Sequence, residues 1–315
     1  MDRDLTIIIV NWNTRDRLRD CLASLPEACH GLQIQTLVID NASHDGSPEM
    51  VQAEFPHCRL LESGGNLGFT RGNNLALGKA TSRQILLLNP DTVCPSGSLT
   101  ALSRFLDDHE DAAAVGPLLV DATGAETASY GFFPQEWHHL AATLDPQRRW
   151  LPGRWRQEGL GCVPAPDMPS GPVDYVKGAC LLMRRSALER IGVLDEQFFM
   201  YFEESDWCRR AWLAGYRILL CNEVAVAHLE GRATRQVSFF SLIQFQLSYR
   251  LFITKHYGRW RLPGFRLVQF VEYGLKGLLR SLSPRNRQVN RSLARSHFAT
   301  ARLQLRNRLF VQPPG

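Results

Sequence analysis

The first 120 residues alternate short apolar runs with amphipathic segments, and this alternation restricts the fold more than any other feature of the chain. Each run has the length of one buried strand, and each amphipathic segment repeats its apolar residues at helical spacing. Such alternation is typical of an α/β fold, in which a mostly parallel sheet is flanked by helices. We therefore predict strands at residues 6–10, 36–39, 59–61, 85–88 and 113–119, and helices at residues 15–25, 47–55, 70–80 and 97–109.

Polar side chains follow three of these strands at the point where each strand ends. Asn11 follows the first strand, Asp40 the second, and the segment Asn89-Pro90-Asp91 the fourth. Ligands of open α/β sheets bind outside the carboxyl ends of the strands. The sequence therefore predicts one polar ligand site to which three strand ends contribute.

The common dinucleotide and triphosphate loops do not fit this region. Residues 65–68 (GNLG) follow a strand and open a helix, but GxGxxG does not fit over them. Residues 72–80 do not form a Walker loop, because Ala80 stands where a Ser or Thr would bind magnesium, and we interpret them as a helix interior. Residues 65–68 still suit a diphosphate, because a turn rich in backbone N–H groups lies beside Arg71.

A second polar cluster lies in FFMYFEESDWCRR, residues 198–210, where Glu203, Glu204 and Asp206 begin a predicted helix. Acids favour the first helical turn because they complement the helix dipole, and this explains one or two of the three. The aromatic and Met residues before them would desolvate a carboxylate and raise its pKa, which suits a general base. The cluster therefore predicts a catalytic carboxylate.

An irregular segment separates the two clusters. Residues 121–172 contain seven prolines and three tryptophans, a composition that predicts a lid or a binding loop. Regular structure then resumes, with helices that begin at Ser186 and near Glu203. The predicted strands of this part are residues 173–178, 181–184, 216–220 and 224–228.

Together these motifs resemble those of glycosyltransferase family 2, a family of inverting enzymes, and within it those of the bacterial rhamnosyltransferase-like group. The resemblance rests on IIIVNWNTRDRLRDCLASL, VIDNASHDGS, GGNLGFTRGNN, LLLNPDT, VKGACLLMRRSAL, FFMYFEESDWCRR and VAHLEG, in this order over roughly residues 5 to 231. It implies a GT-A fold over residues 1–230, with a nucleotide-binding half at 1–119 and an acceptor-binding half at 120–230. Residues 231–315 would then be a basic helical extension.

The resemblance also implies roles for individual residues. The nucleotide-sugar-binding residues that it implies are Asn11, Asp40, Asn66, Gly68, Arg71, Asn73 and Asn89. Asn11 and Asp40 would hold the ribose and base, and Asn89 would hydrogen-bond the sugar or ribose. The other four fall where the family's glycine-containing turn lies near the nucleotide sugar.

The family's metal motif is Asp-x-Asp after the fourth strand, where this chain has Asn89-Pro90-Asp91. Only Asp91 is a carboxylate, so the resemblance implies Asp91 as one metal ligand and His228, at the end of the last predicted strand, as another. Mg²⁺ or Mn²⁺ suits oxygen ligands and a diphosphate. A purely structural role is the alternative for His228, because a lone His at a strand end is more often structural.

The implied reaction is a single displacement that inverts the anomeric carbon. A carboxylate removes the proton of the acceptor hydroxyl, and a metal neutralises the departing nucleoside diphosphate. Glu204 matches the position of the family's base, where the family has Asp. Asp206 is the second candidate, and Glu203 also stays open.

The subgroup likeness implies dTDP-rhamnose as donor, with a UDP-linked hexose as the alternative. The implied acceptor is a hydroxyl of a glycan or of a polyprenyl-diphosphate-linked glycan in bacterial surface polysaccharide synthesis. A non-catalytic nucleotide-sugar-binding protein would also fit the single carboxylate of Asn-Pro-Asp, but the presence together of Asp40, Asp91, Glu204, Asp206 and His228 disfavours it. A nucleotidyltransferase is disfavoured because no glycine follows the first strand.

The C-terminal segment differs from the rest in charge. Residues 232–315 contain 16 Lys and Arg and one acid, whereas residues 1–231 contain 20 basic and 30 acidic residues. Helical spacing predicts an apolar stripe of Leu267, Val271, Leu275, Leu278 and Leu282 opposite Arg266, Gln269, Tyr273, Lys276 and Arg280. Such a stripe can lie on an anionic membrane surface or pack on the catalytic domain, and the sequence leaves both open. We predict no nucleic-acid partner, because no recognised motif accompanies the charge.

Three further features predict a cytoplasmic protein. Residues 1–4 are charged and lack the apolar core of a signal peptide, and the eight cysteines are scattered without CxxC spacing, as expected for reduced thiols. No window reaches the ~18 apolar residues that span a bilayer. The basic segment adds peripheral attachment to the inner face of the cell membrane as an option.

Overall fold

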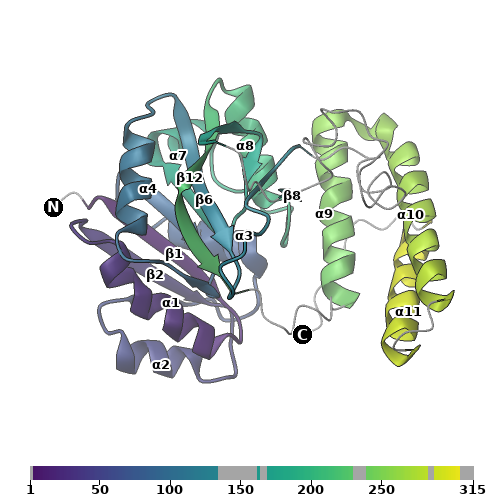
Figure 1. The fold of residues 1–315 in the computed structure, drawn as a ribbon, viewed down its shortest axis with the longest axis horizontal. Helices are drawn as coiled ribbons and strands as arrows, with labels where there is room; N and C mark the ends of the chain where they lie inside the picture. Colours follow the sequence, from purple (N-terminus) through teal and green to yellow (C-terminus); the bar gives the residue numbers. More distant parts are fainter. Residues whose placement is uncertain (1–2, 134–161, 164–168, 230–238, 283–286, 306–315) are drawn as a thin grey trace. The chain divides into compact units, whose positions relative to one another are not determined.

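The computed structural model describes residues 3–133, 162–163, 169–229, 239–282 and 287–305. The chain divides into two compact units, one of Met1–Gly131 with Cys162–Arg232 and one of Phe132–Gly161 with Ala233–Gly315. The described part of the first unit is an α/β structure, drawn from purple to green in Figure 1. The described part of the second unit is almost entirely helical.

One mixed sheet forms the centre of the first unit. Its strands are β1 (Leu5–Asn11), β2 (Ile34–Asp40), β3 (Arg59–Glu62), β4 (Gln84–Leu88), β5 (Thr92–Val93), β6 (Ala112–Val120), β9 (Gly171–Val173), β11 (Cys180–Arg184) and β12 (Arg217–His228). The strand order is β3-β2-β1-β4-β11-β6-β12-β5, and β9 also pairs with β12. The first four strands run parallel, as predicted, and their register places Asn11 beside Asp40. Polar residues at the ends of β1 and β2 therefore lie at one edge of the sheet.

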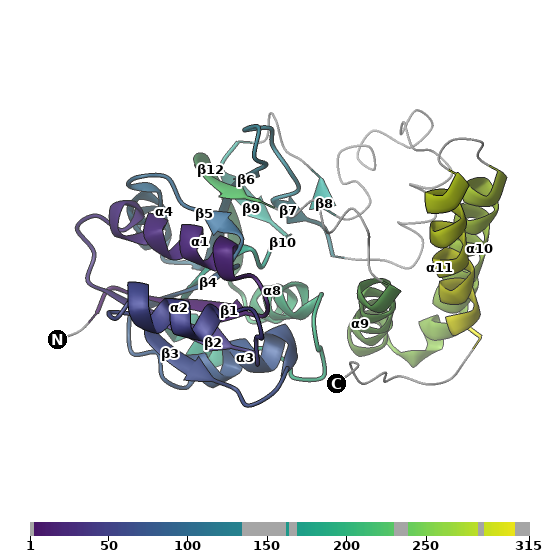
Figure 2. The same ribbon diagram turned by 90° about the horizontal axis from the view of Figure 1, so that it is seen from below.

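Helices flank this sheet, as the amphipathic segments predicted. They are α1 (Arg15–Ala28), α2 (Ser47–Glu54), α3 (Gly68–Leu77), α4 (Ser98–Asp107), α7 (Arg185–Ile191) and α8 (Glu203–Leu213). The apolar faces of α1, α2 and α4 join one buried cluster with side chains of β1 and β4, so these helices cover the same face of the sheet (Figure 2). Every residue of β1 and β4 is buried, which agrees with their continuous apolar sequences.

The structure refines three details of the sequence prediction. β11 runs antiparallel between β4 and β6, a direction that the sequence did not predict. The predicted strands at residues 216–220 and 224–228 form one strand, β12, which begins at Arg217 and whose register on β6 shifts between Cys221 and Ala225. The polar residues Asn222 and Glu223 lie at this irregularity, between the two predicted strands. α3 also begins earlier than predicted, at Gly68.

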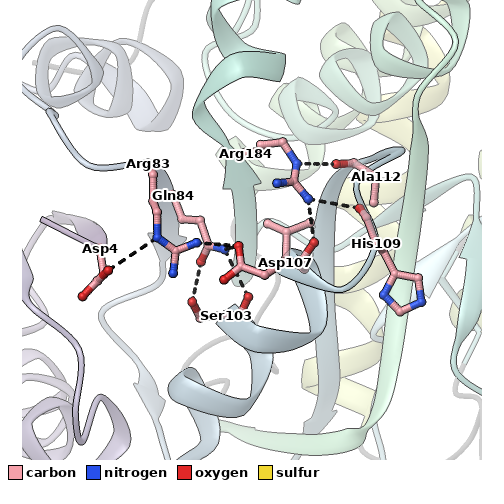
Figure 3. A network of polar contacts seen from close by, with 9 residues as sticks. Asp4, Arg83, Gln84, Ser103, Asp107, His109, Ala112 and Arg184 are labelled. Atoms are coloured by element: carbon pink, nitrogen blue, oxygen red, sulfur yellow. Dashed lines mark hydrogen bonds and ion pairs between the residues drawn. The ribbon is translucent and has the colours of Figure 1, made fainter. Parts of the chain in front are cut away.

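A polar network fastens β11 to the end of α4 (Figure 3). The Arg184 guanidinium donates hydrogen bonds to the carbonyl oxygens of Leu106, His109 and Ala112, at 2.6, 3.0 and 3.1 Å. These carbonyls lie at and beyond the C-terminal end of α4, where helical carbonyls lack intrahelical partners. Arg184 therefore satisfies three backbone acceptors and holds the inserted strand against the helix.

A second, small sheet follows β6. It has the order β10-β7-β8 and consists of β7 (Tyr130–Gly131), β8 (Cys162–Val163) and β10 (Tyr175–Val176). The predicted strand at 173–178 thus belongs to two sheets, since β9 ends at Val173. Most of the proline-rich segment predicted to be a lid or binding loop lies outside the described residues.

The described part of the second unit contains three long helices. They are α9 (Phe239–Tyr257), α10 (Leu262–Leu282) and α11 (Arg287–Leu303), with the short 3₁₀ helix η2 (Arg259–Arg261) before α10. α10 packs mainly on α11. Leu267 and Leu278, which belong to the predicted stripe of α10, are exposed, whereas Gln269 and Tyr273 on the opposite face are buried. No helix among these residues is long and apolar enough to cross a membrane.

The cysteines behave as the sequence predicted. The seven whose side chains the structure describes are unpaired, and all but the half-buried Cys58 are buried. Burial raises the pKa of Cys21 to about 12 and that of Cys58 to about 11, so these thiols stay protonated at neutral pH. They act as small apolar side chains.

Candidate active site

Backbone strain is concentrated at the carboxyl edge of the central sheet. Among the described residues, the non-glycine residues with positive φ are Asn13, Ala42, Tyr201 and Phe202, with φ between 54° and 68°. Asn13 follows β1, Ala42 follows β2, and the other two immediately precede α8. Such conformations cost free energy and persist where the surrounding structure enforces them, often at functional sites. Their positions mark the loops that enclose this edge of the sheet.

Asn11 and Asp40 form a buried pair at the ends of β1 and β2. The Asn11 amide donates to Asp40 Oδ1 and to Ser43 Oγ, both at 3.0 Å. The backbone N–H of Ser43 donates to Asp40 Oδ2 at 2.8 Å. Asn11 therefore orients the Asp40 carboxylate and the loop that follows β2.

A cavity of about 330 Å³ opens beside this carboxylate. Asp40 lies in its lining, and Asn11 does not. The other lining residues are Ala42, Ser43, His44, Pro48, Glu49, Gln52, Glu62 and Gly64. The sequence prediction missed His44 and Glu62, although their positions shortly after β2 and at the end of β3 were a usable signal. The cavity offers hydrogen-bond acceptors and donors to a polar ligand at the strand ends.

Gly68 connects the turn after β3 to the loop that precedes α8. The Gly68 N–H donates to Asn66 Oδ1 at 3.0 Å, and the Asn41 amide donates to the Gly68 carbonyl oxygen at the same distance. Gly68 has φ +79°, and a Cβ added there would lie 2.5 Å from the Phe199 carbonyl oxygen. That oxygen also accepts a hydrogen bond from the Phe69 N–H at 2.9 Å. Only glycine permits this close approach.

Arg71 and Asn73 occupy different environments on α3. Arg71 is exposed and lies 3.4 Å from the Glu196 carboxylate. Asn73 is buried and donates to the Phe69 carbonyl oxygen at 2.9 Å within its own helix. The neighbouring Asn74, which the sequence prediction missed, holds the loop between α7 and α8 through two hydrogen bonds with the Leu194 backbone, at 2.9 and 3.2 Å. Arg71 thus lies at the surface, and Asn73 lies inside.

Asp91 and His228 meet at the end of the sheet. Their side chains approach to 3.2 Å, between Asp91 Oδ1 and His228 Nε2. β5 pairs with β12 so that Thr92 lies opposite His228, and the Leu229 N–H donates to the Asp91 carbonyl oxygen. The Asn89 amide nitrogen lies 3.4 Å from His228 Nε2. The structure therefore brings the two implied metal ligands together and places Asn89, implied to bind the sugar or ribose, beside them.

The donor atoms of this pair suit a hard divalent cation in part. A carboxylate oxygen and an imidazole nitrogen face each other at the rim of the sheet, and the Asp91 side chain is one quarter exposed. No group of three or more His, Cys, Asp or Glu side chains suited to a metal occurs among the described residues. Mg²⁺ and Mn²⁺ commonly use one or two protein ligands together with substrate phosphates and water. The pair therefore fits an ion that is completed by a diphosphate.

Glu203 and Glu204 begin α8 as buried carboxylates. Burial, and to a smaller extent the charge of Glu204, holds the pKa of Glu203 well above its usual range. Burial also raises the pKa of Glu204, but the nearby Lys177 acts in the opposite direction. One oxygen of each carboxylate has no hydrogen-bond partner. Lys177 favours the ionised form of Glu204, which distinguishes Glu204 from Glu203 as a base.

Asp206 has a structural environment. Its buried carboxylate accepts a hydrogen bond from Arg210 Nε at 2.9 Å, one helical turn away. The same guanidinium donates to the carbonyl oxygens of Ile191 and Val193. Asp206 therefore orients Arg210, which fastens α8 to the end of α7.

A short segment before β11 connects the metal-ligand candidates to the glutamates. The Asn89 N–H donates to the Ala179 carbonyl oxygen at 2.9 Å. A Cβ added at Gly178 would lie 3.7 Å from Glu204 Cβ. Asn89 and Glu204 thus contact adjacent residues, so the two polar clusters predicted from the sequence lie at one edge of the sheet. The sequence prediction did not assign a role to Lys177 or Gly178.

Comparison with known proteins identifies the family. The model of glycosyl transferase family 2 matches residues 6–192, which is more than half of the chain. This chain belongs to glycosyltransferase family 2. The enzyme is 29% identical over 275 residues to the N-acetylglucosaminyl-diphospho-decaprenol L-rhamnosyltransferase of Mycobacterium tuberculosis (strain ATCC 25618 / H37Rv), covering 82% of this chain and 87% of the relative. It is 26% identical over 251 residues to the low-salt glycan biosynthesis hexosyltransferase Agl10 of Haloferax volcanii, covering 78% and 73%.

Solved structures confirm the fold of this family 2 glycosyltransferase. The mannosyltransferase PcManGT from Pyrobaculum calidifontis, in complex with GDP-Man and Mn²⁺, aligns with a TM-score of 0.55 at 15% identity, over 97% of this chain and 88% of that one. TarS 1–349 of S. aureus in complex with UDP-GlcNAc aligns with a TM-score of 0.53 at 15% identity, over 96% and 90%. The predicted GT-A fold with a C-terminal helical region is therefore confirmed.

Proposed function

We propose that this glycosyltransferase moves a hexose, with inversion, from a nucleoside diphosphate sugar to a hydroxyl of a lipid-linked glycan. One observation carries the proposal. The pair Asp91–His228 and the buried Glu204 reach the same edge of the sheet, connected through Asn89, Ala179 and Gly178. Groups that suit a diphosphate-bound cation and a group that suits proton removal are thereby adjacent.

In this proposal the nucleotide lies against the cavity beside Asp40. Asn11 fixes the Asp40 carboxylate as an acceptor for N–H or O–H groups of the base or ribose. The turn at Asn66 and Gly68, with Arg71 on the exposed side, lies towards the sugar diphosphate. Asn73 supports the turn from inside α3, because its side chain is buried and bonded to Phe69.

Asp91 and His228 would hold Mg²⁺ or Mn²⁺, and Asn89 lies beside them to hydrogen-bond the ribose or sugar. When bound, the ion supplies charge that stabilises the leaving nucleoside diphosphate. Glu204 accepts the proton of the acceptor hydroxyl as that oxygen attacks the anomeric carbon on the face opposite the leaving group. Lys177 favours the ionised form of Glu204 for this step, and Asp206 holds α8 in place through Arg210.

The donor and acceptor follow from the named relatives. The M. tuberculosis relative is an L-rhamnosyltransferase that acts on a polyprenyl-diphosphate-linked sugar, which favours dTDP-rhamnose and an acceptor of this class. The relative Agl10 is a hexosyltransferase, so a UDP-linked hexose is the alternative donor. In this assignment residues 1–230 are the catalytic domain and residues 231–315 an extension to it.

A donor panel tests the proposal. The purified enzyme is incubated with dTDP-rhamnose and UDP-hexoses, with Mg²⁺ or Mn²⁺ and with or without EDTA, and nucleoside diphosphate release is measured. We expect release from one donor, with loss of that release in EDTA. No release from any donor in the presence of a polyprenyl-diphosphate-linked acceptor, together with no donor-dependent rise in Tm, would overturn the proposal. A rise in Tm without release would indicate a nucleotide-sugar-binding protein.

The Asp91→Asn variant tests the metal assignment separately. It removes the only carboxylate of the proposed pair, so Mn²⁺ binding in the presence of nucleoside diphosphate should weaken at least about tenfold. Isothermal titration measures this binding directly, without reliance on turnover. Unchanged Mn²⁺ affinity would contradict the assignment. The exposed Asp108 offers a matched control, because Asp108→Asn changes the same charge away from the site.

A further inference from the structure

The outer face of α10 is apolar and faces solvent. We call this face the α10 stripe. Its members are Leu267, Phe270, Val271, Leu278, Leu279 and Leu282, and between 39% and 71% of each residue is exposed. An amphipathic helix of a globular protein normally turns its apolar side to the core. Contiguous exposed apolar surface instead marks a site of interaction.

The polar face of α10 keeps the α10 stripe on the outside of the helical unit. Tyr273 on α10 accepts a hydrogen bond from the buried Gln246 of α9 at 3.0 Å. Gln246 in turn accepts one from Gln304, just beyond α11, at 3.0 Å. On the same side, a Cβ added at Gly277 would lie 2.8 Å from the Phe298 ring of α11. Turning the stripe inward would break these contacts between the helices.

The charge of residues 232–315 is unusually one-sided. The only acid of residues 232–315 is Glu272, which is buried and forms an ion pair with Lys276. The exposed basic residues among the described part of the unit are Lys255, Arg259, Arg280, Arg291, Arg295 and Arg302. The described surface of the helical unit therefore carries positive charge without any exposed carboxylate.

Part of this charge lies on α11, the helix that packs on α10. Arg291, Arg295, Phe298 and Arg302 are spaced by four, three and four residues, so they share one exposed face of α11. The Phe298 ring of this face lies against α10 at Gly277. Three exposed arginines therefore lie on the neighbour of α10.

Trp260, in η2 just before α10, is a further exposed aromatic side chain of the helical unit. It is 75% exposed, and the Arg261 guanidinium lies 5.0 Å from its ring. Tryptophan favours the boundary between lipid and water, because its ring is apolar and its N–H needs a polar partner. An exposed Trp beside arginines is expected where a protein meets that boundary.

We propose that the α10 stripe, with the arginines of α11 and with Trp260, docks on the surface of an anionic lipid bilayer. The leucines enter the boundary between headgroups and acyl chains, and the arginines contact lipid phosphates. The stripe from Leu267 to Leu282 is about 22 Å long at the rise of an α-helix, so α10 lies along the surface. A second copy of the chain is disfavoured, because it would bring two positive surfaces together. The proposal goes beyond glycosyl transfer and does not depend on it.

Vesicle sedimentation tests this surface with the full chain and without nucleotide sugar. The probes are vesicles of equal parts phosphatidylglycerol and phosphatidylcholine, and vesicles of phosphatidylcholine alone. We expect strong binding to the first, weakened by high salt, and at least about tenfold weaker binding to the second. The double variant L278E/L282E should lower the partition coefficient at least about tenfold, because it places carboxylates in the stripe. R295Q/R302Q should weaken binding less and reduce its dependence on salt.

Matched measurements distinguish the other occupants of the stripe. The control is Leu213→Glu, which alters an equally exposed leucine of the first unit and should leave vesicle binding unchanged. No binding to either vesicle would overturn the proposal. So would a dimer in sedimentation velocity that L278E/L282E dissociates, or a lower urea midpoint for that variant without any change in vesicle binding. The last result would show that the stripe packs on the chain itself.

Discussion

The two units of this glycosyltransferase distribute polar and apolar side chains differently. In the first unit the strands β1 and β4 are buried and mostly apolar, and polar groups gather at one edge of the sheet. In the second, the amides of Gln246 and Gln269 are buried together with apolar side chains of α9 and α10, while Leu278 and Leu282 are exposed. Exposed leucines over a partly polar interior suit a helical unit whose surroundings include an apolar phase.

The largest expected effect lies in the chemistry of the first unit. Glu204→Gln should lower kcat about 10²- to 10⁴-fold, because the amide cannot accept the proton of the acceptor hydroxyl. Transfer to a water-soluble acceptor, followed by nucleotide release, measures it. The exposed Glu110 serves as a control, since Glu110→Gln should leave the rate unchanged. Near-normal kcat for Glu204→Gln would exclude it as the base.

The comparison between units also predicts different responses to the same truncation. Leu86 is fully buried in β4, and Leu86→Ala should lower the free energy of unfolding by about 3 kcal/mol through lost burial and a residual cavity. Leu278 is about half exposed, so Leu278→Ala should cost less than about 0.5 kcal/mol. Urea denaturation in the absence of lipid measures both. Equal losses would show that Leu278 is as buried as Leu86, which would contradict the exposure of the α10 stripe.

Two arginines, one in each unit, extend the comparison of the two interiors to polar side chains. Arg184 donates to three backbone carbonyls in the first unit, so Arg184→Met removes three hydrogen bonds and should cost about 2 kcal/mol, although the Leu106 and His109 oxygens keep backbone donors. Arg250 in α9 is 1% exposed, and its Nε and Nη1 have no hydrogen-bond partner. Burial, with the charge of Arg266, lowers the pKa of Arg250.

Arg250→Met should therefore leave the free energy of unfolding unchanged or raise it by about 1 kcal/mol, because it removes an uncompensated buried charge. Both variants keep an unbranched apolar side chain of similar length, so they differ mainly in the partners that are lost. Urea midpoints give the comparison. A loss at Arg250 as large as that at Arg184 would show that Arg250 has partners of equal strength.

The sequence predicted the first unit better than the second, and the physical reason is local. Strands buried on both faces and helices between them produce strong patterns, so the elements before Val120, apart from the short β5, were found within a few residues. The antiparallel β11 was not predicted, because the direction of a strand leaves no trace in its own side chains. Four of the six residues of the α10 stripe were named from their spacing, but spacing shows which residues share a face and not which face is buried.

The site was predicted in its chemistry more than in its geometry. Asp91 and His228 were named together through the family resemblance, and the structure brings them within 3.2 Å. Lys177 was missed because it lies near Glu204 only in the folded chain. The two residues are far apart in the sequence. Gly68 was listed near the nucleotide, whereas its close approach to Phe199 could only be seen in three dimensions.

The smallest predicted effect concerns the pH dependence of stability. The pKa of Glu203 in the folded protein lies well above its ordinary value of 4.5, mainly because the carboxyl is buried. Between these two pKa values the folded protein holds a proton that the unfolded chain has lost. The free energy of unfolding must therefore fall as the pH rises from about 4.5 towards the raised pKa.

Glu203→Gln removes this titration, so its free energy of unfolding should fall less steeply over the same pH window. At neutral pH the variant should be more stable than the parent enzyme, because it avoids the cost of ionising a buried carboxyl. Urea titrations at several pH values measure it, with Glu110→Gln as the exposed control. Parallel profiles for parent and variant would mean that Glu203 is ionised in the folded protein. In that case Glu203, like Glu204, would be a candidate for the base that accepts the proton of the acceptor hydroxyl.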